Sequence, residues 1–341
     1  MDHQVTIKTI ASKTNFSLTT VSRVLNGTSE KYRISKSTQD IILKEAALQG
    51  YIPNMAAKTL RNNKSYTIGL IVPSLNNPFF SKVASTLTKI LFKHGFVVVI
   101  SDCDNNEKEE ERILKTLLSH NLSGLIAIPI GVKKNYEILK SLHINTVFID
   151  RFFDDFEYFS VSTDHYNSTT LLMEHLIEMG HEKIACIQGD LNAISNQLRV
   201  KGYEKAIKKH SLIYNYVAGS SFTTEKGYEE MKLLINQKDR PTAVIALSDT
   251  ILLGMLKAIK EENLRIPEDI SVVSIDNSSY LDYLQVPITS IDQPVLEIAD
   301  FAANLIIDIL DGKIVYNSNS TDKNITIESQ IIKRSSVKKI E

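Results

Sequence analysis

From Tyr66 onward the chain alternates short apolar segments with longer helical ones, and this pattern restricts the possible folds more than any other feature. The apolar segments are nearly continuous runs rich in Val and Ile, as in strands that are buried on both faces of a sheet. Strands are predicted at Thr67–Val72, Phe96–Ser101, Gly124–Ile128, Thr146–Ile149, Lys183–Gln188, Ala243–Leu247 and Ser271–Ile275. The alternation therefore predicts an α/β body of parallel sheets covered by helices on both faces.

The intervening helices are predicted at Pro78–His94, Lys108–Ser119, Tyr166–Met179, Ser195–Lys209, Glu225–Asn236 and Thr250–Glu262. Two strand–helix series of similar size favour two sheets over one, with the break near Ser162–Asp164. The less regular end is expected to hold a crossing segment at Thr289–Gln293, a helix at Pro294–Leu310 and a final strand at Ile325–Ile332. The body, residues 66–341, is thus expected to form a first subdomain of about 66–163 and 293–321 and a second of about 164–292 and 322–335.

Residues 1–61 form a module of a different kind. A first helix is expected to end at Thr14, a tight turn to follow at Asn15, and Ser17 to cap a second helix at Leu18–Leu25. Apolar side chains on both helices can pack against one another, which leaves the polar face of the second helix outward. This is the pattern of a helix-turn-helix, and the alternative is a small helical hairpin without a DNA role.

A third helix is predicted at Lys36–Gln49, with Ser35 as its cap and Gly50 at its left-handed exit. Pro53 ends that structure, and Asn54–Arg61 holds good helix formers over only about two turns. Because so short a helix is marginal alone, we expect it to be ordered only when something packs against it.

The charge of the chain is unevenly distributed. Residues 1–64 hold ten Lys and Arg against four Asp and Glu, whereas the remainder holds 29 basic and 36 acidic residues. The near-neutral total of −1 therefore hides a basic head on an acidic body. A concentrated basic patch is what the release of counterions from DNA phosphates requires, so the charge favours a DNA-binding head.

The composition is that of an ordinary soluble protein, and 341 residues are enough for two or three domains. The first residues are polar and unlike a signal peptide, and no apolar run reaches the length of a membrane span. Cys103 and Cys186 are too few and too far apart to indicate a disulfide framework or a metal site. We therefore expect a cytoplasmic protein with no metal, no cofactor and no membrane partner.

Several separate motifs occur along the chain in one order, namely VTIKTIA, TTVSRVLNG, GYIPNMAAKTLR, YTIGLIVPSLNNPFF, HLIEMGHEKIACIQG, RVKGYEKAI, PTAVIALSD and IPEDISVVSID. With these motifs the chain resembles the lactose-repressor/galactose-repressor (LacI/GalR) family of bacterial transcription regulators over essentially its whole length. The resemblance implies an all-α helix-turn-helix headpiece joined to a two-subdomain, periplasmic-binding-protein-like body. It also implies a homodimer on an imperfect palindromic operator in double-stranded DNA.

The resemblance places DNA contacts on particular residues. Base-reading positions fall on Leu18, Thr19 and Arg23, and Arg23 suits this role because a guanidinium can pair with guanine O6 and N7. Phosphate-contacting positions fall on Thr6, Ser17, Thr20, Ser22 and Asn26. The hinge helix, 54–61, would enter the minor groove with Asn54, Ala57 and Leu60, of which Leu60 is the wedge.

Two departures from the family pattern occur in the head. The turn that commonly carries Gly-Val has Asn15 and Phe16 here, and Asn tolerates a positive φ, so the turn should persist. The loop Thr28–Ile34 is a few residues longer than usual, and this length is expected to alter backbone contacts nearby.

By the same resemblance, a small sugar effector would bind in the cleft between the two sheets, at the carboxyl ends of strands. One wall would consist of Asn77, Phe79, Phe80, Asp150 and Arg151, and the other wall and the hinge of Arg199, Phe222, Ser248, Asp276 and Gln293. Aromatic faces can cover sugar C–H groups while charged and amide groups bind hydroxyls. Taken singly, each residue has a structural alternative, such as a core aromatic or an ion pair.

Enzyme functions receive little support. The chain lacks a Gly-rich dinucleotide fingerprint, a phosphate-loop Gly-Lys-Ser/Thr, a nucleophile elbow and a His-Glu-x-x-His motif. Asp150 and Asp276 could be proposed as a hydrolytic carboxylate pair, but the neighbouring Arg151 and Arg199 should keep both ionised, which does not suit a general acid. A sugar kinase or hydrolase with an accessory DNA head is the alternative from another class.

The sequence therefore predicts an allosteric, homodimeric repressor of carbohydrate-utilisation genes that leaves its operator when it binds a sugar. Two Asp and two Arg in the expected cleft balance, which favours a neutral pentose or hexose over a sugar phosphate. The alternative within regulators is a protein that binds DNA better with its ligand, as a corepressor would produce.

Overall fold

The computed structural model describes residues 5–52, 65–153, 155–315 and 323–340. The chain divides into two compact units, Met1–Lys64 and Ser65–Glu341. The hinge helix expected at 54–61 lies outside the described residues.

Within residues 5–52 the first unit contains three helices, α1 (Ile7–Thr14), α2 (Leu18–Leu25) and α3 (Lys36–Leu48). Hydroxyl caps begin each of them, because Thr6, Ser17 and Ser35 accept hydrogen bonds from backbone N–H groups three residues on, at 3.1–3.3 Å. Asn15 joins α1 to α2 with a φ of 55°, so the unusual turn is accommodated in the left-handed region. Ile10, Val21 and Ile42, one from each helix, are fully buried in the shared core.

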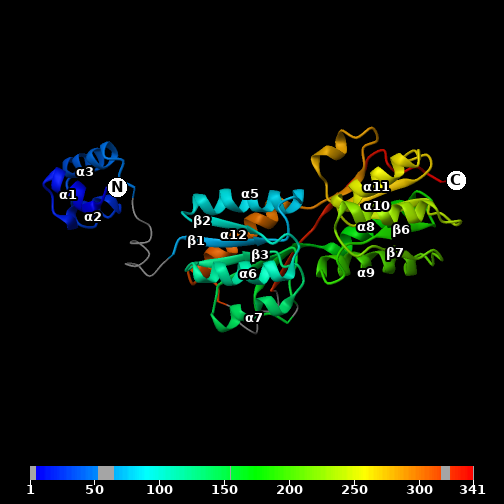
Figure 1. Ribbon diagram of the computed structural model, residues 1–341, viewed down its shortest axis with the longest axis horizontal. Helices are drawn as coiled ribbons and strands as arrows, with labels where there is room; N and C mark the ends of the chain where they lie inside the picture. Colours follow the sequence, from blue (N-terminus) through cyan, green and yellow to red (C-terminus); the bar gives the residue numbers. More distant parts are fainter. Residues whose placement is uncertain (1–4, 53–64, 154, 316–322, 341) are drawn as a thin grey trace. The chain divides into compact units, whose positions relative to one another are not determined.

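The second unit contains two α/β halves, which Figure 1 shows side by side. The first half has a six-stranded parallel sheet in the order β11-β5-β4-β3-β1-β2. Its strands are β1 (Thr67–Val72), β2 (Val97–Asp102), β3 (Gly124–Ala127), β4 (Thr146–Ile149), β5 (Phe159–Thr163) and β11 (Asn324–Ile327). Helices α5 (Pro78–Lys93) and α12 (Val295–Leu310) cover one face, and α6 (Glu107–Ser119) and α7 (Lys133–Ser141) cover the other.

The second half repeats this plan with the order β12-β10-β9-β8-β6-β7, in which only β12 is antiparallel to its neighbour among the described strands. The strands are β6 (Ile184–Ile187), β7 (Tyr216–Ala218), β8 (Ala243–Ala246), β9 (Ser271–Ile275), β10 (Thr289–Asp292) and β12 (Gln330–Ile332). Helices α8 (His165–Glu178) and α9 (Ile194–Lys209) pack on one face. Helices α10 (Thr224–Ile235) and α11 (Asp249–Glu261) pack on the other.

The chain passes between the halves at three places: after β5, after β10 and after β11. The single final strand predicted at Ile325–Ile332 is wrong, because β11 pairs with β5 in the first sheet whereas β12 pairs with β10 in the second. The crossing occupies Glu328 and Ser329, and the buried Ser329 hydroxyl lies 2.8 Å from that of Ser168. The first subdomain therefore includes β11, and the expected boundary between residues 321 and 322 falls too early.

Four described elements of the body were absent from the prediction, namely β5, α7, β7 and the short 3₁₀ helix η1 (Ser279–Asp282). Strand β5 carries polar side chains, yet it is fully buried because neighbouring groups satisfy them. The Ser160 hydroxyl donates to Asn324 Oδ1 at 2.8 Å, and Thr163 donates to the Ile327 carbonyl at 3.1 Å. Because a polar strand of this kind has no apolar run, its sequence does not indicate a buried strand.

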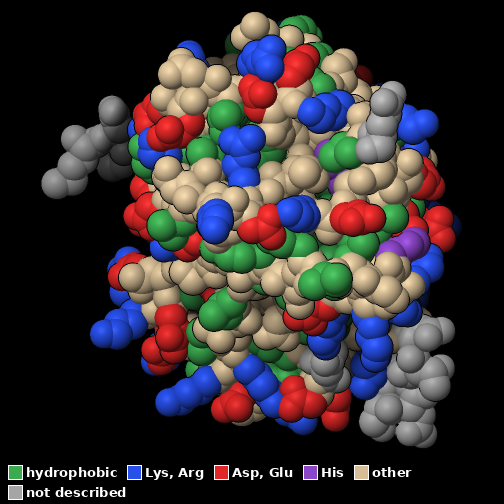
Figure 2. All heavy atoms as spheres, turned by 90° about the vertical axis from the view of Figure 1, so that its right-hand side faces the viewer, with side chains coloured by type: hydrophobic (Ala, Val, Ile, Leu, Met, Phe, Trp, Pro, Cys, Tyr) green, Lys and Arg blue, Asp and Glu red, His purple; other side chains and the backbone are tan. Residues whose placement is uncertain are grey.

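The end of the body that Figure 2 shows carries acidic and basic side chains interspersed with one another. A mixed surface of this kind gives no concentrated positive field, in contrast to the net charge of +6 that the sequence assigns to the first 64 residues. Among the described helices, none combines the length and the apolar character needed to cross a bilayer.

Close packing of α10 on α11 depends on two glycines. A Cβ at Gly254 would lie 2.0 Å from the carbonyl oxygen of Thr224, and one at Gly227 would lie 2.2 Å from that of Ile251. Both obstacles are backbone atoms, so they cannot rotate away as a side chain could.

Gly254→Ala should therefore lower the free energy of unfolding by about 1–3 kcal/mol, as overpacking does elsewhere. Urea denaturation would measure this loss, with Leu253→Ala as the control, because the neighbouring Leu253 is 42% exposed. Equal stability of the two variants would contradict the packing assigned to these helices.

Candidate nucleic-acid interface and ligand cleft

The outward face of α2 and its surroundings carries the residues expected to contact DNA. Leu18 is 48% exposed and Thr19 is exposed beside it, although large apolar side chains are usually covered. Thr6 and Ser17 are also exposed, and Thr20, Ser22, Arg23 and Asn26 are half-buried.

Several of these polar groups already have partners within the head. Thr6 and Ser17 cap helices, and Thr20 Oγ1 lies 2.8 Å from Ser17 Oγ. Asn26 Nδ2 donates to the Ser22 carbonyl at 2.6 Å. The guanidinium carbon of Arg23 lies 3.7 Å from the centroid of the Tyr32 ring, which belongs to the long loop after α2. Asn54, Ala57 and Leu60 lie outside the described residues.

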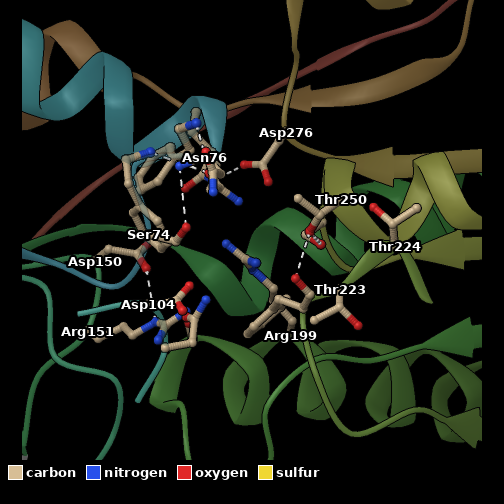
Figure 3. A pocket seen from close by; sticks show the side chains of 18 of the residues that line it. Ser74, Asn76, Asp104, Asp150, Arg151, Arg199, Thr223, Thr224, Thr250 and Asp276 are labelled. Atoms are coloured by element: carbon tan, nitrogen blue, oxygen red, sulfur yellow. Dashed lines mark hydrogen bonds and ion pairs between the residues drawn. The ribbon is translucent and has the colours of Figure 1, made fainter. Parts of the chain in front are cut away.

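The two halves of the body enclose a cavity of about 350 Å³. All ten residues expected at the effector site line it, namely Asn77, Phe79, Phe80, Asp150, Arg151, Arg199, Phe222, Ser248, Asp276 and Gln293. In Figure 3, Asp150 and Arg151 lie on one side and Thr223 and Thr250 on the other, and the side chain of Arg199 reaches between them.

Strand ends and helix starts place these side chains at the cavity. Asp150 directly follows β4 and Asp276 directly follows β9, and both have a positive φ, of 62° and 74°. Asn77 caps α5, with its Oδ1 2.9 Å from the Phe79 N–H, and Ser248 caps α11, with its Oγ 3.2 Å from the Ile251 N–H. The carboxyl ends of parallel strands therefore deliver the charged groups, as in other open α/β sheets.

A chain of contacts through the buried His165 joins the first half to the second. Arg199 Nη2 lies 3.2 Å from His165 Nδ1, and because a guanidinium can only donate, Nδ1 accepts this hydrogen bond. Nε2 is then the donor, and it lies 3.0 Å from the carbonyl oxygen of Asp150 and 3.3 Å from its Oδ1. Arg199 also donates from Nη1 to the Leu247 carbonyl at 2.8 Å.

The charges around Asp150 determine its ionisation. Burial by itself would raise the pKa of this carboxyl, but its interactions with His165, Arg199 and Arg151 outweigh burial and lower the pKa to about 2. The guanidinium carbon of Arg151 lies 5.5 Å from the Phe80 ring centroid and 5.4 Å from that of Phe222. Arg151 therefore contacts one aromatic ring from each half of the body.

Asp276 behaves differently from Asp150. Burial raises its pKa, although the charge of Arg199 and a hydrogen bond from Gln293 Nε2 oppose this effect. The two arginines were expected to favour ionisation of both carboxyls. The lowered pKa of Asp150 agrees with this, whereas burial outweighs the arginines at Asp276 and raises its pKa. Within the described part of the chain, Gln293 Oε1 and Arg199 Nε are buried without a hydrogen-bond partner.

Nine further residues line the cavity and were not expected there. They are Ser74, Asn76, Asp104, Asn105, Ser195, Thr223, Thr224, Glu225 and Thr250. Their shared signal is position, because they follow β1 or β2 or begin α9, α10 or α11. His165 was missed for a different reason, since it opens α8 and is 1% exposed, so it acts through its neighbours.

Two known family models match separate parts of the chain. Residues 6–54 match the family model of bacterial regulatory proteins of the lacI family, and residues 173–337 match that of a periplasmic binding protein-like domain. The chain thus carries a lacI-family helix-turn-helix domain and a periplasmic-binding-protein-like domain. It is a DNA-binding transcriptional regulator.

Curated relatives match this protein over most of their length. The transcriptional repressor CytR of Escherichia coli is 29% identical and covers 90% of both chains, and the ribose operon repressor of Haemophilus influenzae is 28% identical over 97% of this chain and 98% of its own. The fold is similar to that of a lac repressor dimer bound to operator and the anti-inducer ONPF, with a TM-score of 0.88, 24% identity and coverage of 98% and 100%. A LacI-family regulator from Enterococcus faecium with bound ribose has a TM-score of 0.71 and 25% identity, over 81% of this chain and 100% of that one.

Two further observations concern metal-ligand residues and thiols in the described part of the chain. No three His, Cys, Asp or Glu side chains there are grouped to hold a metal ion. Cys103 and Cys186 are free and buried, and burial raises the pKa of both thiols, that of Cys103 to about 12.

Asp249 lies at the start of α11, next to the cleft residue Ser248. It is 1% exposed, and Ser278 Oγ donates to its Oδ2 at 2.5 Å. Burial and the nearby charge of Asp276 raise the pKa of Asp249 to about 7. The folded state therefore binds a proton that the unfolded chain has released above about pH 4.

The unfolding free energy should accordingly fall as the pH rises from about 4 to 7, with a slope from this group of up to about 1.4 kcal/mol per pH unit. Asp249→Asn keeps an acceptor for Ser278 and should flatten that slope. Urea unfolding at pH 5, 6 and 7 would measure it, and identical slopes in wild type and variant would contradict the assignment.

Proposed function

We propose that this protein is a cytoplasmic, homodimeric repressor of carbohydrate-utilisation genes. It binds an imperfect palindromic operator in double-stranded DNA, and a small neutral sugar in the interdomain cleft releases it. The observation that carries this proposal is the cavity of about 350 Å³, which is lined by aromatic rings, amides, hydroxyls and charged groups from both halves of the body. Pockets of this size suit small ligands that are largely enclosed.

The chemistry of the lining favours a polyhydroxyl ligand. Phe79, Phe80 and Phe222 offer ring surface for C–H groups, while Arg199 and Gln293 carry polar atoms that lack a partner among the described residues. Hydroxyl groups both donate and accept, so one sugar could satisfy the carboxylates and the guanidiniums together.

The charge of the lining argues against a phosphorylated ligand. The ten residues expected at this site include two Asp and two Arg, whose charges balance. Asp104 and Glu225 also line the cavity, which therefore holds four carboxyl groups and two guanidiniums. A phosphate dianion would meet this acidic surplus at close range, where the effective dielectric constant is low. We therefore infer a neutral pentose or hexose.

The relatives support the same class of ligand and the same assembly. One is named a ribose operon repressor, and structural neighbours contain ribose or cellobiose. The lac repressor with which this fold compares is a dimer on its operator. A twofold dimer presents two copies of α2, which accounts for an expected palindrome.

The head supplies the DNA-binding part of the proposal. Leu18, Thr19 and Arg23 are proposed to read bases, and the polar groups around them to contact phosphates. The second unit begins at Ser65, close in sequence to β1, so a change in the first half can act on the segment that leads to the head. A difference in DNA affinity of about 1–3 kcal/mol between ligand-free and ligand-bound states would suffice for regulation.

A catalytic role for the cleft is not favoured. The low pKa of Asp150, about 2, keeps that carboxyl ionised, so it cannot serve as a general acid near neutral pH.

Tighter operator binding with sugar would identify the ligand as a corepressor and would contradict release.

Arg199→Ala should abolish the response to sugar while the protein still binds its operator, because Arg199 lines the cleft of the second unit whereas the proposed base-reading residues belong to the first. Calorimetry against a panel of pentoses, hexoses and their phosphates, followed by operator binding with and without the sugar that binds, would measure both properties. Phe222→Ala is a second variant with the same expectation, since Phe222 is half-buried and its loss should be tolerated by the fold.

The matched control is Lys201→Ala, because Lys201 lies on the same helix as Arg199 but is exposed. It should bind sugar and operator normally. Binding of a sugar phosphate with no binding of free sugars would overturn the neutral-ligand proposal.

Arg23→Ala should weaken operator binding by about 1–3 kcal/mol and relax the preference at one base pair in each half-site. Lys36→Ala, at the exposed start of α3, should instead weaken binding to every sequence and reduce the salt dependence. Titration of labelled operators that differ at single base pairs would separate the two effects. Unchanged affinity and unchanged preference for Arg23→Ala would show that α2 is not the reading helix.

A further inference from the structure

The loop Thr28–Ile34, which is longer than the family pattern, is a closed and anchored turn. The N–H groups of Tyr32 and Ile34 both donate to the Ser29 carbonyl, at 3.3 and 3.0 Å, and Arg33 takes a φ of 50°. Thr28 Oγ1 donates to the Arg23 carbonyl at 3.0 Å, which ties the loop to the last turn of α2. Ser29 is buried and Ile34 packs against the core, so the central residues of the loop have a defined position.

Tyr32 projects from this loop against the side chain of Arg23. The guanidinium carbon lies 3.7 Å from the ring centroid, a contact distance for a stacked pair, and Lys31 Nζ lies 5.9 Å from the same centroid. The ring is 44% exposed and so contributes little to the core. Of the two cations over the ring, Arg23 of α2 is the closer.

The stack leaves the hydrogen-bonding edge of Arg23 unused. Within residues 5–52, Arg23 makes no side-chain hydrogen bond, and the ion pair described in this unit joins Lys13 to Glu45 instead. Since the N–H groups of a guanidinium lie in its plane, a ring against its face does not block them. An arginine held in this way keeps its donors available for a planar, bidentate partner such as the edge of guanine.

We propose that Tyr32 is a specificity-positioning residue of the DNA-binding surface. Its ring holds the guanidinium of Arg23 in one orientation before DNA is bound, so that less side-chain freedom is lost on binding. Arg23 and Tyr32, the two members of this clamp, both belong to the first unit. The inference rests on the proposed base-reading role of Arg23.

If Tyr32 acts as a clamp, loss of its ring should reduce discrimination between base pairs more than it reduces affinity for DNA. Without the ring, Arg23 samples many rotamers and can meet several bases or phosphates, whereas phosphate contacts elsewhere are unchanged. The preference for the base pair that Arg23 reads should fall about two- to fivefold, the size expected for an exposed cation–π contact. Binding to unrelated DNA should stay the same.

The experiment uses the full-length protein and operators that carry each of the four base pairs at every half-site position. Tyr32→Ala should reduce discrimination at the same position as Arg23→Ala, while Tyr32→Phe, which keeps the ring, should retain it. Lys31→Ala is the matched control in the same loop, and it should lower affinity for all sequences alike. Adding Tyr32→Ala to Arg23→Ala should change discrimination no further, since the ring acts through that arginine.

Each other outcome is decisive. If Arg23→Ala alters no base preference, the proposed role of Arg23 fails and the clamp fails with it. If Arg23→Ala alters the preference but Tyr32→Ala leaves it unchanged, or tightens operator binding, the clamp alone is refuted, and tighter binding would mean that the ring sequesters Arg23. An equal loss on operator and unrelated DNA, with a lower melting temperature, would make Tyr32 a structural residue of the head.

Discussion

The buried contact of Asp150, His165 and Arg199 links the two halves of the body at the floor of the cleft. Asp150 belongs to the end of β4 in the first half, whereas His165 and Arg199 belong to helices of the second. Burying a carboxylate is costly unless charge and hydrogen bonds compensate it, and here the compensation comes from the opposite half. The relative position of the two sheets at the cleft is therefore coupled to the ionisation of a group inside it.

That coupling explains why the cleft can respond to a ligand. Arg199 is held at two of its nitrogens, by the Leu247 carbonyl and by His165, but its Nε has no partner among the described residues. Arg151 contacts Phe80 from the first half and Phe222 from the second. A ligand that satisfies these groups must interact with both halves at once, so its binding energy depends on how they are arranged.

Periodicity sufficed to predict much of this fold. Nearly continuous apolar runs indicated the central strands, and hydroxyl caps such as Ser17 and Ser35 indicated where helices begin. Strand β5 escaped because its buried hydroxyls are satisfied by β11, which lies far away in sequence. The division of β11 from β12 escaped for a related reason, since an apolar stretch carries no record of which sheet its parts join.

The cleft was only partly predictable from the sequence. The ten cleft residues came from family motifs and lie around one cavity, whereas Asp104, Glu225 and His165 depend on tertiary neighbours that no local motif records. The stack of Tyr32 on Arg23 was also hidden, because it joins a helix to the loop that follows and no local motif records such a contact.

The three crossings between the halves have a consequence for synthesis on the ribosome. The first half needs α12 and β11, which emerge after nearly all of the second half, and the second half needs β12, which emerges last. Neither sheet can therefore be completed before β11 and β12 have emerged, although domains usually fold in turn as they are made. Until then the edges at β5 and β10 lack their partner strands, so the two halves are completed almost together.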